Sequence, residues 1–249
     1  MKVSIITAVF NRESTIGDAM RSVQTQTHPD IEHIVVDGAS TDSSLDRIRD
    51  HADNRTRIVS EPDDGIYDAL NKGIHLASGD VIGLMHSDDF YASSRVIEYV
   101  VGAFQEDGVD GVYGDLEYVS GNNPDHVIRY WSAGAYSVER LKWGWMPPHP
   151  TLYLRRAVIE QYGAYNTEYR IAADYEAMLR WLLQGRIDLA YVPRVFVRMR
   201  VGGASNSSVK QIVRKSLEDY KALRENRGGG VWTLLMKNLR KVKQFFVRG

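Results

Sequence analysis

The chain of 249 residues contains no cysteine. This absence excludes disulfide bonds, thiolate metal sites and a thiol nucleophile, and it permits a reducing compartment. No apolar run is long enough to cross a bilayer. The opening residues 1–13 hold one lysine and a short apolar run that ends at Asn11, so they predict a first strand and not a signal peptide. We expect a cytoplasmic protein.

Motifs that mark several common chemistries are also missing. The chain has no G-x-x-x-x-G-K-[ST] or G-x-G-x-x-G phosphate loop, no H-E-x-x-H and no G-x-S-x-G. Outside the last 24 residues the lysines and arginines are scattered, which disfavours a nucleic-acid ligand. What the chain does have is an ordinary globular composition, with acidic residues at the ends of its apolar runs.

Strand-like apolar runs alternate with amphipathic helices through the first half of the chain. Residues 66–77, for example, place Ile66, Leu70, Gly73 and Ala77 on one helical face. This alternation predicts an α/β fold with a mostly parallel central sheet flanked by helices. The expected strands are 2–10, 31–37, 57–61 and 80–86, and the expected helices are 14–26, 41–52 and 66–77.

The second half of the chain is less regular. Its glycine-rich residues 227–230 indicate a linker before a last helix. We therefore predict one domain over residues 1–226 and a C-terminal tail over residues 227–249. The other expected strands are 108–119, 126–131, 188–193 and 195–200, and the other expected helices are 172–183 and 207–224.

Short, mostly polar segments lie where the predicted parallel strands end, which is where such sheets bind ligands. They fall at residues 10–11, 37, 61–64 and 87–89. The pair Asp88 and Asp89 ends a buried run, and each carboxylate raises the pKa of the other. Mg²⁺ or Mn²⁺ would relieve that repulsion and admit an anionic diphosphate. The alternative is that the pair caps the next helix.

Four ordered stretches resemble the family-two glycosyltransferases. They are "VSIITAVFNRESTIGDAMRSVQTQT", "EHIVVDGASTDSS", "SEPDDGIYDALNKGIHLASGDVIGLMHSDDFY" and, more loosely, "HPTLYLRRAVIEQYGAYNTEYRIAADYEAMLR". The resemblance covers roughly residues 3–185. It implies the type-A nucleotide-sugar-binding fold and inverting transfer of a sugar from a nucleotide-diphosphate sugar to a hydroxyl acceptor. Residues 1–92 would form the nucleotide-binding half and residues 93–226 the acceptor half.

The resemblance also implies which residues hold the nucleotide. They are Thr7 and Asn11, in and just after the first strand, and Asp37 at the end of the second, where a carboxylate can accept hydrogen bonds from a base or ribose. The alternative for Asp37 is a turn, since "DGASTD" is also good turn chemistry. The chain departs from the family pattern at Gly38, where a second acid is common, and at Ala39, where glycine is.

Further donor and metal residues follow from the same resemblance. Asp68 and Lys72 border the donor site in one branch of the family, although residues four apart can simply form a helical ion pair. Asp89 is the first-choice metal ligand. Asp88 is the second-choice metal ligand and also faces the donor. His149, between two prolines, could touch the metal or diphosphate, or cap a loop.

Transfer to a hydroxyl needs a base to accept the hydroxyl proton. Asp174 resembles the family's catalytic acid at the start of a helix, and an apolar stripe would pin that helix; Glu176 is the second choice. The alternative is a helix-start aspartate favoured by the helix dipole alone. Trp143 and Trp145 would suit stacking on an acceptor sugar, or core or lid packing. The stripe comprises Tyr175, Met178, Leu179 and Leu182.

The C-terminal tail has its own pattern. One helical face carries Trp232, Leu235, Leu239, Val242 and Phe246, and another groups Lys237, Arg240, Lys241 and Arg248. A basic amphipathic helix of this kind favours the inner face of a membrane and a lipid-linked acceptor. The alternative is docking on the body of the protein or on a second subunit.

Two other functions stay open at this stage. Sugar nucleotidyltransferases share the fold, but the glycine-rich, arginine-containing loop that they use on a nucleoside triphosphate is missing after Ala8. A non-catalytic nucleotide-sugar-binding scaffold is the other. The sequence does not identify the sugar, the base, the acceptor, the linkage or the oligomeric state.

Overall fold

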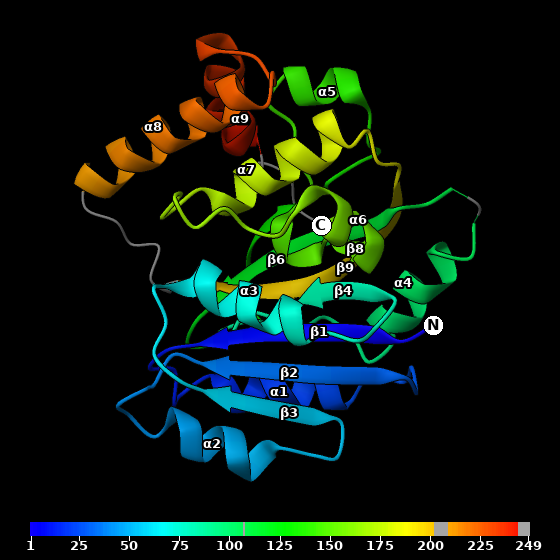
Figure 1. Ribbon diagram of the computed structural model, residues 1–249, viewed down its shortest axis with the longest axis vertical. Coiled ribbons are helices and arrows are strands. Elements are labelled where there is room, and N and C mark those ends of the chain that lie inside the picture. Colours follow the sequence, from blue (N-terminus) through cyan, green and yellow to red (C-terminus); the bar gives the residue numbers. More distant parts are fainter. Residues whose placement is uncertain (107, 202–208, 244–249) are drawn as a thin grey trace.

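The computed structural model describes residues 1–106, 108–201 and 209–243 (Figure 1). A nine-stranded sheet crosses the molecule in the order β3-β2-β1-β4-β8-β6-β9-β5, with β7 paired to β6. Its first four strands are all parallel, as the alternating pattern predicts. These strands are β1 (Val3–Val9), β2 (Ile31–Asp37), β3 (Thr56–Ser60) and β4 (Val81–Leu84).

Helices cover both faces of the parallel strands because successive strand residues point to opposite sides. In β1, Ile6 belongs to a core cluster with Leu70 of helix α3 (Ile66–Leu76). Its neighbour Ile5 belongs to a second core cluster, on the other side of the sheet. The helices on that second side are α1 (Ile16–Gln24), α2 (Ser44–His51) and α4 (Val96–Ala103).

The other strands form a mixed part of the sheet. Strand β9 (Leu189–Val201) runs parallel to β6 (Gly111–Ser120), and β8 (Tyr153–Arg155) joins β6 to β4 by antiparallel pairing. The prediction of two strands over residues 188–200 is wrong. One strand passes through Pro193, and the register shift opposite Gly114 accommodates the proline as a bulge.

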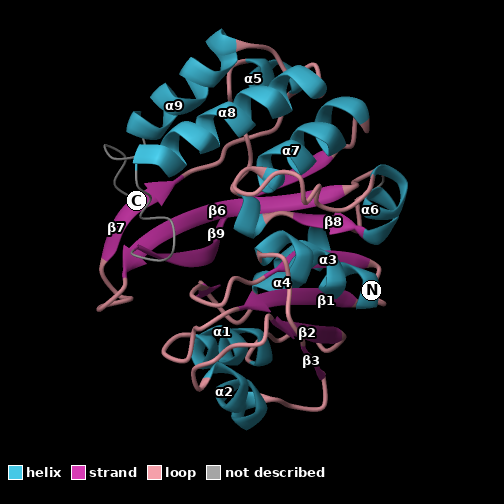
Figure 2. Cartoon of the chain, turned by 60° about the vertical axis from the view of Figure 1, so that its left-hand side comes forward, coloured by secondary structure: helices cyan, strands magenta, loops and turns pink. Residues whose placement is uncertain are grey.

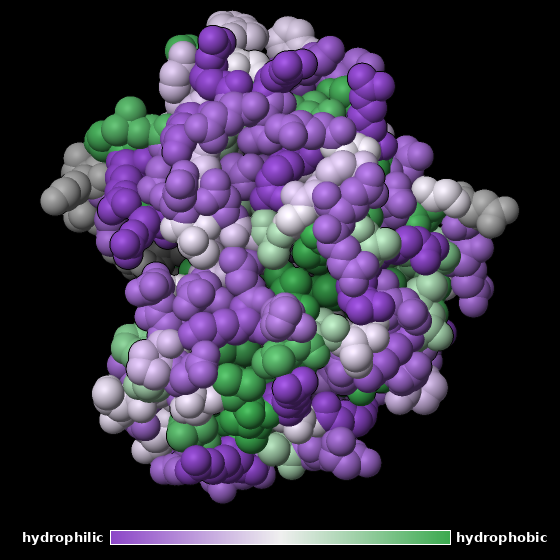
Figure 3. Space-filling view, viewed as in Figure 1, coloured by the Kyte–Doolittle hydropathy of each residue, from purple (hydrophilic) through white to green (hydrophobic). Residues whose placement is uncertain are grey.

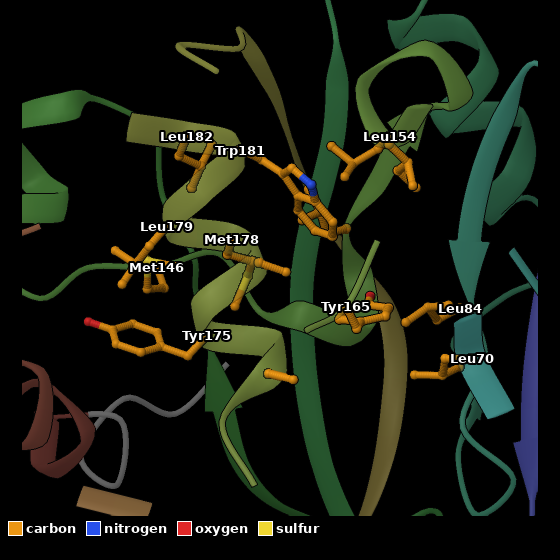
Figure 4. Packing of buried hydrophobic residues seen from close by; sticks show 14 of the residues in the cluster. Leu70, Leu84, Met146, Leu154, Tyr165, Tyr175, Met178, Leu179, Trp181 and Leu182 are labelled. Carbon is orange, nitrogen blue, oxygen red and sulfur yellow. The ribbon is translucent and has the colours of Figure 1, made fainter. Parts of the chain in front are cut away.

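Short elements link the mixed strands, and several of them have no clear periodicity in the sequence. The two strands β5 (Phe90–Tyr91) and β7 (Val127–Trp131) pair with β9 and β6. The helices are α5 (Val138–Lys142), α6 (Arg156–Tyr162) and α7 (Ala173–Leu179), and α7 continues as a π-helical turn, Arg180–Gln184. Figure 4 shows the predicted apolar stripe of α7, with Tyr165 between this helix and Leu84 of β4.

Two C-terminal helices lie together beside α7 at one end of the molecule (Figures 1 and 2). They are α8 (Val209–Glu225) and α9 (Val231–Lys243). The described part of the chain contains no helix with the length and apolarity needed to cross a membrane. The predicted helix start at residue 207, and the predicted positions of Phe246 and Arg248, lie outside the described residues.

Candidate functional site

Asn11 and Asp37 organise a turn at the carboxyl ends of β1 and β2. The Asn11 side-chain oxygen accepts a hydrogen bond from the backbone N–H of Thr41 at 2.9 Å. The Asp37 carboxylate accepts from the Ser40 N–H and, at 2.7 Å, from the Ser60 hydroxyl. These contacts match the turn interpretation of Asp37. Nucleotide contact by Asn11 and Asp37 stays a prediction.

Thr7 lies inside the sheet. Its side chain is fully buried, and its hydroxyl lies 2.9 Å from Nε2 of His33 on the neighbouring strand. A nucleotide could therefore reach Thr7 through its side chain only if this buried pair opened. The structure does not bring the Thr7 side chain together with Asn11 and Asp37.

The two departures from the family pattern have structural counterparts. Ala39 has a φ of +58°, a conformation that glycine adopts more readily. At Gly38, a Cβ would lie 2.2 Å from Oδ2 of Asp63, so the carboxylate of Asp63 fills the place of a side chain at position 38. Asp63 itself is held by the backbone N–H of Gly65 at 2.8 Å. An acid is therefore present beside Asp37, but it comes from the loop after β3.

Asp68 and Lys72 form an ion pair within helix α3, which was the alternative to their contacting the donor. Their charged atoms are 3.4 Å apart, and Lys72 also pairs with Glu61 at 3.0 Å. Lys72 donates a further hydrogen bond to the carbonyl of Pro62 at 2.8 Å. These contacts attach helix α3 to the loop after β3. A direct contact of either residue with the donor stays a prediction.

A positively charged side chain, that of Arg200 in β9, lies beside the Asp88-Asp89 pair. Its guanidinium donates to the backbone carbonyl of Asp88 at 2.9 Å and to Asp18 at 2.7 Å. Its backbone N–H donates to Oδ1 of Asp89 at 3.1 Å. Burial, and then the charge of Asp88, raise the pKa of Asp89 well above its usual range, and Arg200 only partly opposes them.

The fit of a divalent cation depends on the second oxygen of Asp89. Oδ2 is buried and has no hydrogen-bond partner, which is costly for a carboxylate unless a ligand satisfies it. No three His, Asp or Glu side chains converge as a complete metal site within residues 1–106, 108–201 and 209–243. Mg²⁺ needs only one or two protein carboxylates when phosphates and waters complete its shell. Asp88 and Asp89 therefore fit an ion that arrives with a diphosphate.

His86 and His149 connect the acidic pair to Asp174. Their rings are 6.0 Å apart, and Nε2 of His149 lies 2.9 Å from the Tyr165 hydroxyl. His86 interacts electrostatically with both Asp88 and Asp174. Burial lowers the pKa of His149 to about 4, so this ring is neutral at pH 7. His149 thus lies beside His86 and Tyr165, and its contact with a metal or diphosphate stays a prediction.

Asp174 lies in the first turn of α7, as predicted. Its Oδ1 accepts a hydrogen bond from the backbone N–H of Tyr175 at 2.8 Å, and the Tyr67 hydroxyl lies 3.3 Å from the same oxygen. Burial acts to raise the pKa of Asp174, but His149, Lys215 and Lys237 outweigh it, and the pKa is lowered. Because its pKa is lowered, this carboxylate is ionised at pH 7. An ionised carboxylate can accept a proton.

The remaining predicted residues have other partners. Glu176 is buried and pairs with Arg180 at 3.0 Å, which disfavours it as an alternative base. Trp145 is buried, and its ring N–H donates to the carbonyl of Ala133 at 2.7 Å, so it belongs to the core. Trp143 is half exposed.

Sequence reasoning missed several residues of this site. Tyr67 reaches Asp174 and Arg200 reaches Asp88 from more than 100 residues away, and Tyr165 contacts His149 from 16 residues away. Tyr67 lies in the quoted segment "DDGIYDALNKG", so its position near the donor motif was an available signal. Nothing local to Arg200 indicates its role, because its partners are set by the pairing of β5 with β9.

Comparison with known sequences gives the family. Residues 4–163 match the family model described as glycosyl transferase family 2. A PGL/p-HBAD biosynthesis glycosyltransferase of Mycobacterium tuberculosis is 30% identical over 219 residues, which cover 86% of this chain and 83% of the relative. An uncharacterized glycosyltransferase of the same organism is 33% identical over 187 residues, 72% of this chain and 68% of the relative.

Solved structures agree on the fold. S. aureus TarS 1-349 in complex with UDP-GlcNAc superposes with a TM-score of 0.66 at 17% identity, over 91% of this chain and 65% of that chain. This chain spans 39% of a longer TarS chain. The mannosyltransferase PcManGT from Pyrobaculum calidifontis, in complex with GDP-Man and Mn²⁺, superposes with a TM-score of 0.68 at 16% identity, over 100% of this chain and 76% of that chain. The α/β architecture, the family match and the related sequences together establish that this chain belongs to glycosyl transferase family 2 and is a glycosyltransferase.

Proposed function

We propose that the chain transfers a sugar, with inversion, from a nucleotide-diphosphate sugar to a hydroxyl acceptor in a Mg²⁺- or Mn²⁺-dependent reaction. The observation that carries this proposal is that the half-buried His86 and His149, whose rings are 6.0 Å apart, both interact with the ionised Asp174, and His86 also with Asp88. Asp174 accepts the proton of the acceptor hydroxyl as that oxygen attacks the sugar. Asp88 and Asp89 hold the divalent ion, which when bound neutralises charge on the departing diphosphate.

The donor belongs to the parallel half of the sheet, residues 1–92. Asn11 and Asp37 contact the nucleoside, and Asp63 adds a carboxylate next to Asp37. TarS and PcManGT form complexes with UDP-GlcNAc and GDP-Man, which supports a nucleotide-sugar donor here without choosing the base. Asp68 and Lys72 act on the donor mainly by holding the loop that carries Asp63.

The acceptor belongs to the half of the chain over residues 93–226. A relative from M. tuberculosis is described as acting in PGL/p-HBAD biosynthesis, which supports an acceptor in glycolipid or polysaccharide assembly. The exposed Trp232, Leu235 and Leu239 of α9 support a peripheral position on the inner face of the membrane. A lipid-linked acceptor would meet the enzyme there.

Thermal unfolding with UDP, GDP, dTDP and CMP, each with and without Mn²⁺, tests the donor part. At about a hundredfold over its Kd, the correct nucleotide should raise the melting temperature by roughly 5–10 °C. No shift with any of the four would support a scaffold that does not bind nucleotide donors. Release of nucleoside diphosphate from the matching nucleotide sugar then tests turnover, because hydrolysis needs no identified acceptor.

A further inference from the structure

Helices α8 and α9 carry an unusual share of exposed apolar surface. Half of the sixteen exposed large hydrophobic side chains of the described residues lie on these two helices. Hydrophobic atoms are visible along the outer end of α8 in Figure 3. Soluble proteins rarely expose such a contiguous patch unless it contacts a partner or a membrane. The eight residues are Ile212, Val213, Leu217, Tyr220, Val231, Trp232, Leu235 and Leu239.

The way α9 is attached keeps its apolar face outward. The Thr233 hydroxyl donates to the carbonyl of Lys142 at 3.0 Å, and Lys237 pairs with the buried Asp219 of α8 at 2.8 Å. A Cβ at Gly144 would lie 2.4 Å from the backbone nitrogen of Lys237, so α9 approaches this glycine very closely. These polar contacts, together with Leu234 packed against the core, fix the orientation of α9 and leave Trp232, Leu235 and Leu239 exposed.

The two helices also enclose an apolar groove. Its volume is about 320 Å³, and it is lined by Ser216 and by apolar side chains of both helices, among them Leu217, Tyr220 and Val231. A water-filled groove of this lining is unfavourable, and an acyl chain would fill it with matching chemistry. The groove makes α8 part of the exposed apolar surface, which the sequence pattern of α9 alone does not predict.

Charge on these helices identifies the kind of partner. Residues 209–243 contain ten lysines and arginines and three acidic residues, a net charge of +7, which leaves −8 on the rest of the chain. A segment that is both basic and apolar is attracted to anionic lipid head groups. A second copy of this chain would bring two identical apolar faces together. It would also bring together two segments of the same positive charge, which repel each other.

We propose that α8 and α9 together form a docking surface for an anionic lipid bilayer, with lipid acyl chains filling the groove between them. This inference rests on the proposed function in placing the acceptor at a membrane, and it extends that proposal by assigning the docking surface to both helices.

The docking surface is joined directly to the predicted base. Glu218 of α8 accepts hydrogen bonds from the backbone N–H groups of Ile171, at 2.8 Å, and Ala172, at 3.0 Å, just before Asp174. Lys237 of α9 lies over the ring of Tyr175, 3.1 Å from its centroid. A bilayer bound to α8 and α9 would therefore lie close to the segment that carries Asp174, where a lipid-borne hydroxyl acceptor is needed.

The test is co-sedimentation of the full chain with vesicles of 30% phosphatidylglycerol in phosphatidylcholine, and with phosphatidylcholine alone. We expect binding to the anionic vesicles that weakens with salt, and little binding to the neutral ones. Leu217→Ser on α8 should weaken anionic-vesicle binding about tenfold, because one buried leucine contributes that order of free energy. Ile128→Ser on β7 is the matched control, since Ile128 is also exposed (48%, against 64% for Leu217) but lies on another element.

Three results would overturn the inference: no binding to anionic vesicles, equal binding by Leu217→Ser and the parent, or equal loss in the Ile128→Ser control. A parent dimer that Leu217→Ser dissociates, without vesicle binding, would instead assign the surface to a second copy. The nucleotide-induced shift in melting temperature, measured without lipid, tests the proposed function separately. It should be unchanged in Leu217→Ser.

Discussion

The hydroxyl of Tyr67 on α3 lies 3.3 Å from Oδ1 of Asp174 on α7, across 107 residues of sequence. The same hydroxyl lies 2.9 Å from the carbonyl of Ile171, the residue whose N–H is bound by Glu218. The segment before α7 is thus held from the donor side by α3 and from the C-terminal side by α8. This arrangement fixes the position of the predicted base relative to the donor half of the sheet.

Asp174→Asn should abolish most of the turnover and leave donor binding intact. The amide cannot accept the acceptor proton, so kcat should fall by about 10² to 10⁴. The measurement is steady-state transfer or hydrolysis, together with the nucleotide-induced shift in melting temperature. Asp46→Asn, an exposed carboxylate on α2, is the control and should keep full activity. Equal kcat in parent and Asp174→Asn would remove Asp174 from the mechanism.

Tyr67→Phe should move the acidic limb of the pH–rate profile to higher pH. The Tyr67 hydroxyl can donate a hydrogen bond to the ionised Asp174, and loss of such a bond raises the pKa of a carboxylate. Activity that requires ionised Asp174 would then be lost at a higher pH as the solution is acidified. We expect a shift of roughly half a unit or more, with kcat lowered about tenfold at neutral pH. A profile identical to that of the parent would mean that Tyr67 does not position Asp174.

Local sequence pattern predicts the parallel half of the fold well, because each strand and helix there has its own complete periodicity. Thus Ile5 and Ile6 of β1 separate onto the two faces as the alternation requires. The same reasoning fails at Pro193, where pairing with β6 across a bulge keeps one strand intact. Tertiary pairing overrides local propensity at such positions.

The residues of the candidate site also fall into those that local sequence predicts and those that depend on tertiary contacts. Asp174 and the Asp88-Asp89 pair could be predicted as candidate site residues because their motifs are local and ordered. Tyr67 offered one local signal, its place near the donor motif, but its contact with Asp174 depends on the folded sheet. The contacts of Arg200 with Asp89 and of Glu218 with the segment before α7 likewise join different elements. Thr7 illustrates the converse: its motif is local, but the orientation of its side chain toward His33 depends on the register of β1 and β2.

Asp89→Asn should remove the Mn²⁺-dependent part of the nucleotide shift. The amide keeps a hydrogen-bond acceptor for the Arg200 N–H but is a much weaker ligand for a hard divalent cation. The measurement is the melting temperature with the matching nucleotide, with and without Mn²⁺, and the ligand-free value reports on folding. The Asp46→Asn control should retain the full metal-dependent shift. A metal-dependent shift of parental size in Asp89→Asn would assign Asp89 a purely structural role.

Gly38→Ala should be destabilising only while Asp63 is present. The new Cβ would displace the Asp63 carboxylate, whose bond to the Gly65 N–H contributes about 1 kcal/mol. Urea unfolding of Gly38→Ala, Asp63→Ala and the double variant forms a thermodynamic cycle. We expect the cost of Gly38→Ala to vanish in the Asp63→Ala background. Equal costs in both backgrounds would place the strain elsewhere in the turn.

His33→Gln should make the free energy of unfolding less dependent on pH. Burial lowers the pKa of His33 from 6.5 to about 4, so below pH 6.5 the unfolded chain binds a proton that the folded chain does not. Stability is therefore lost as the pH falls from 6.5 toward 4, by about 2 kcal/mol at pH 5 for this one group. Glutamine removes the titration and can still pair with the Thr7 hydroxyl. Urea unfolding at pH 7 and pH 5 should show a decrease about 2 kcal/mol larger in the parent than in the variant. Equal decreases would mean that His33 takes up its proton equally in both states, and thus that the Thr7–His33 pair opens readily inside the sheet.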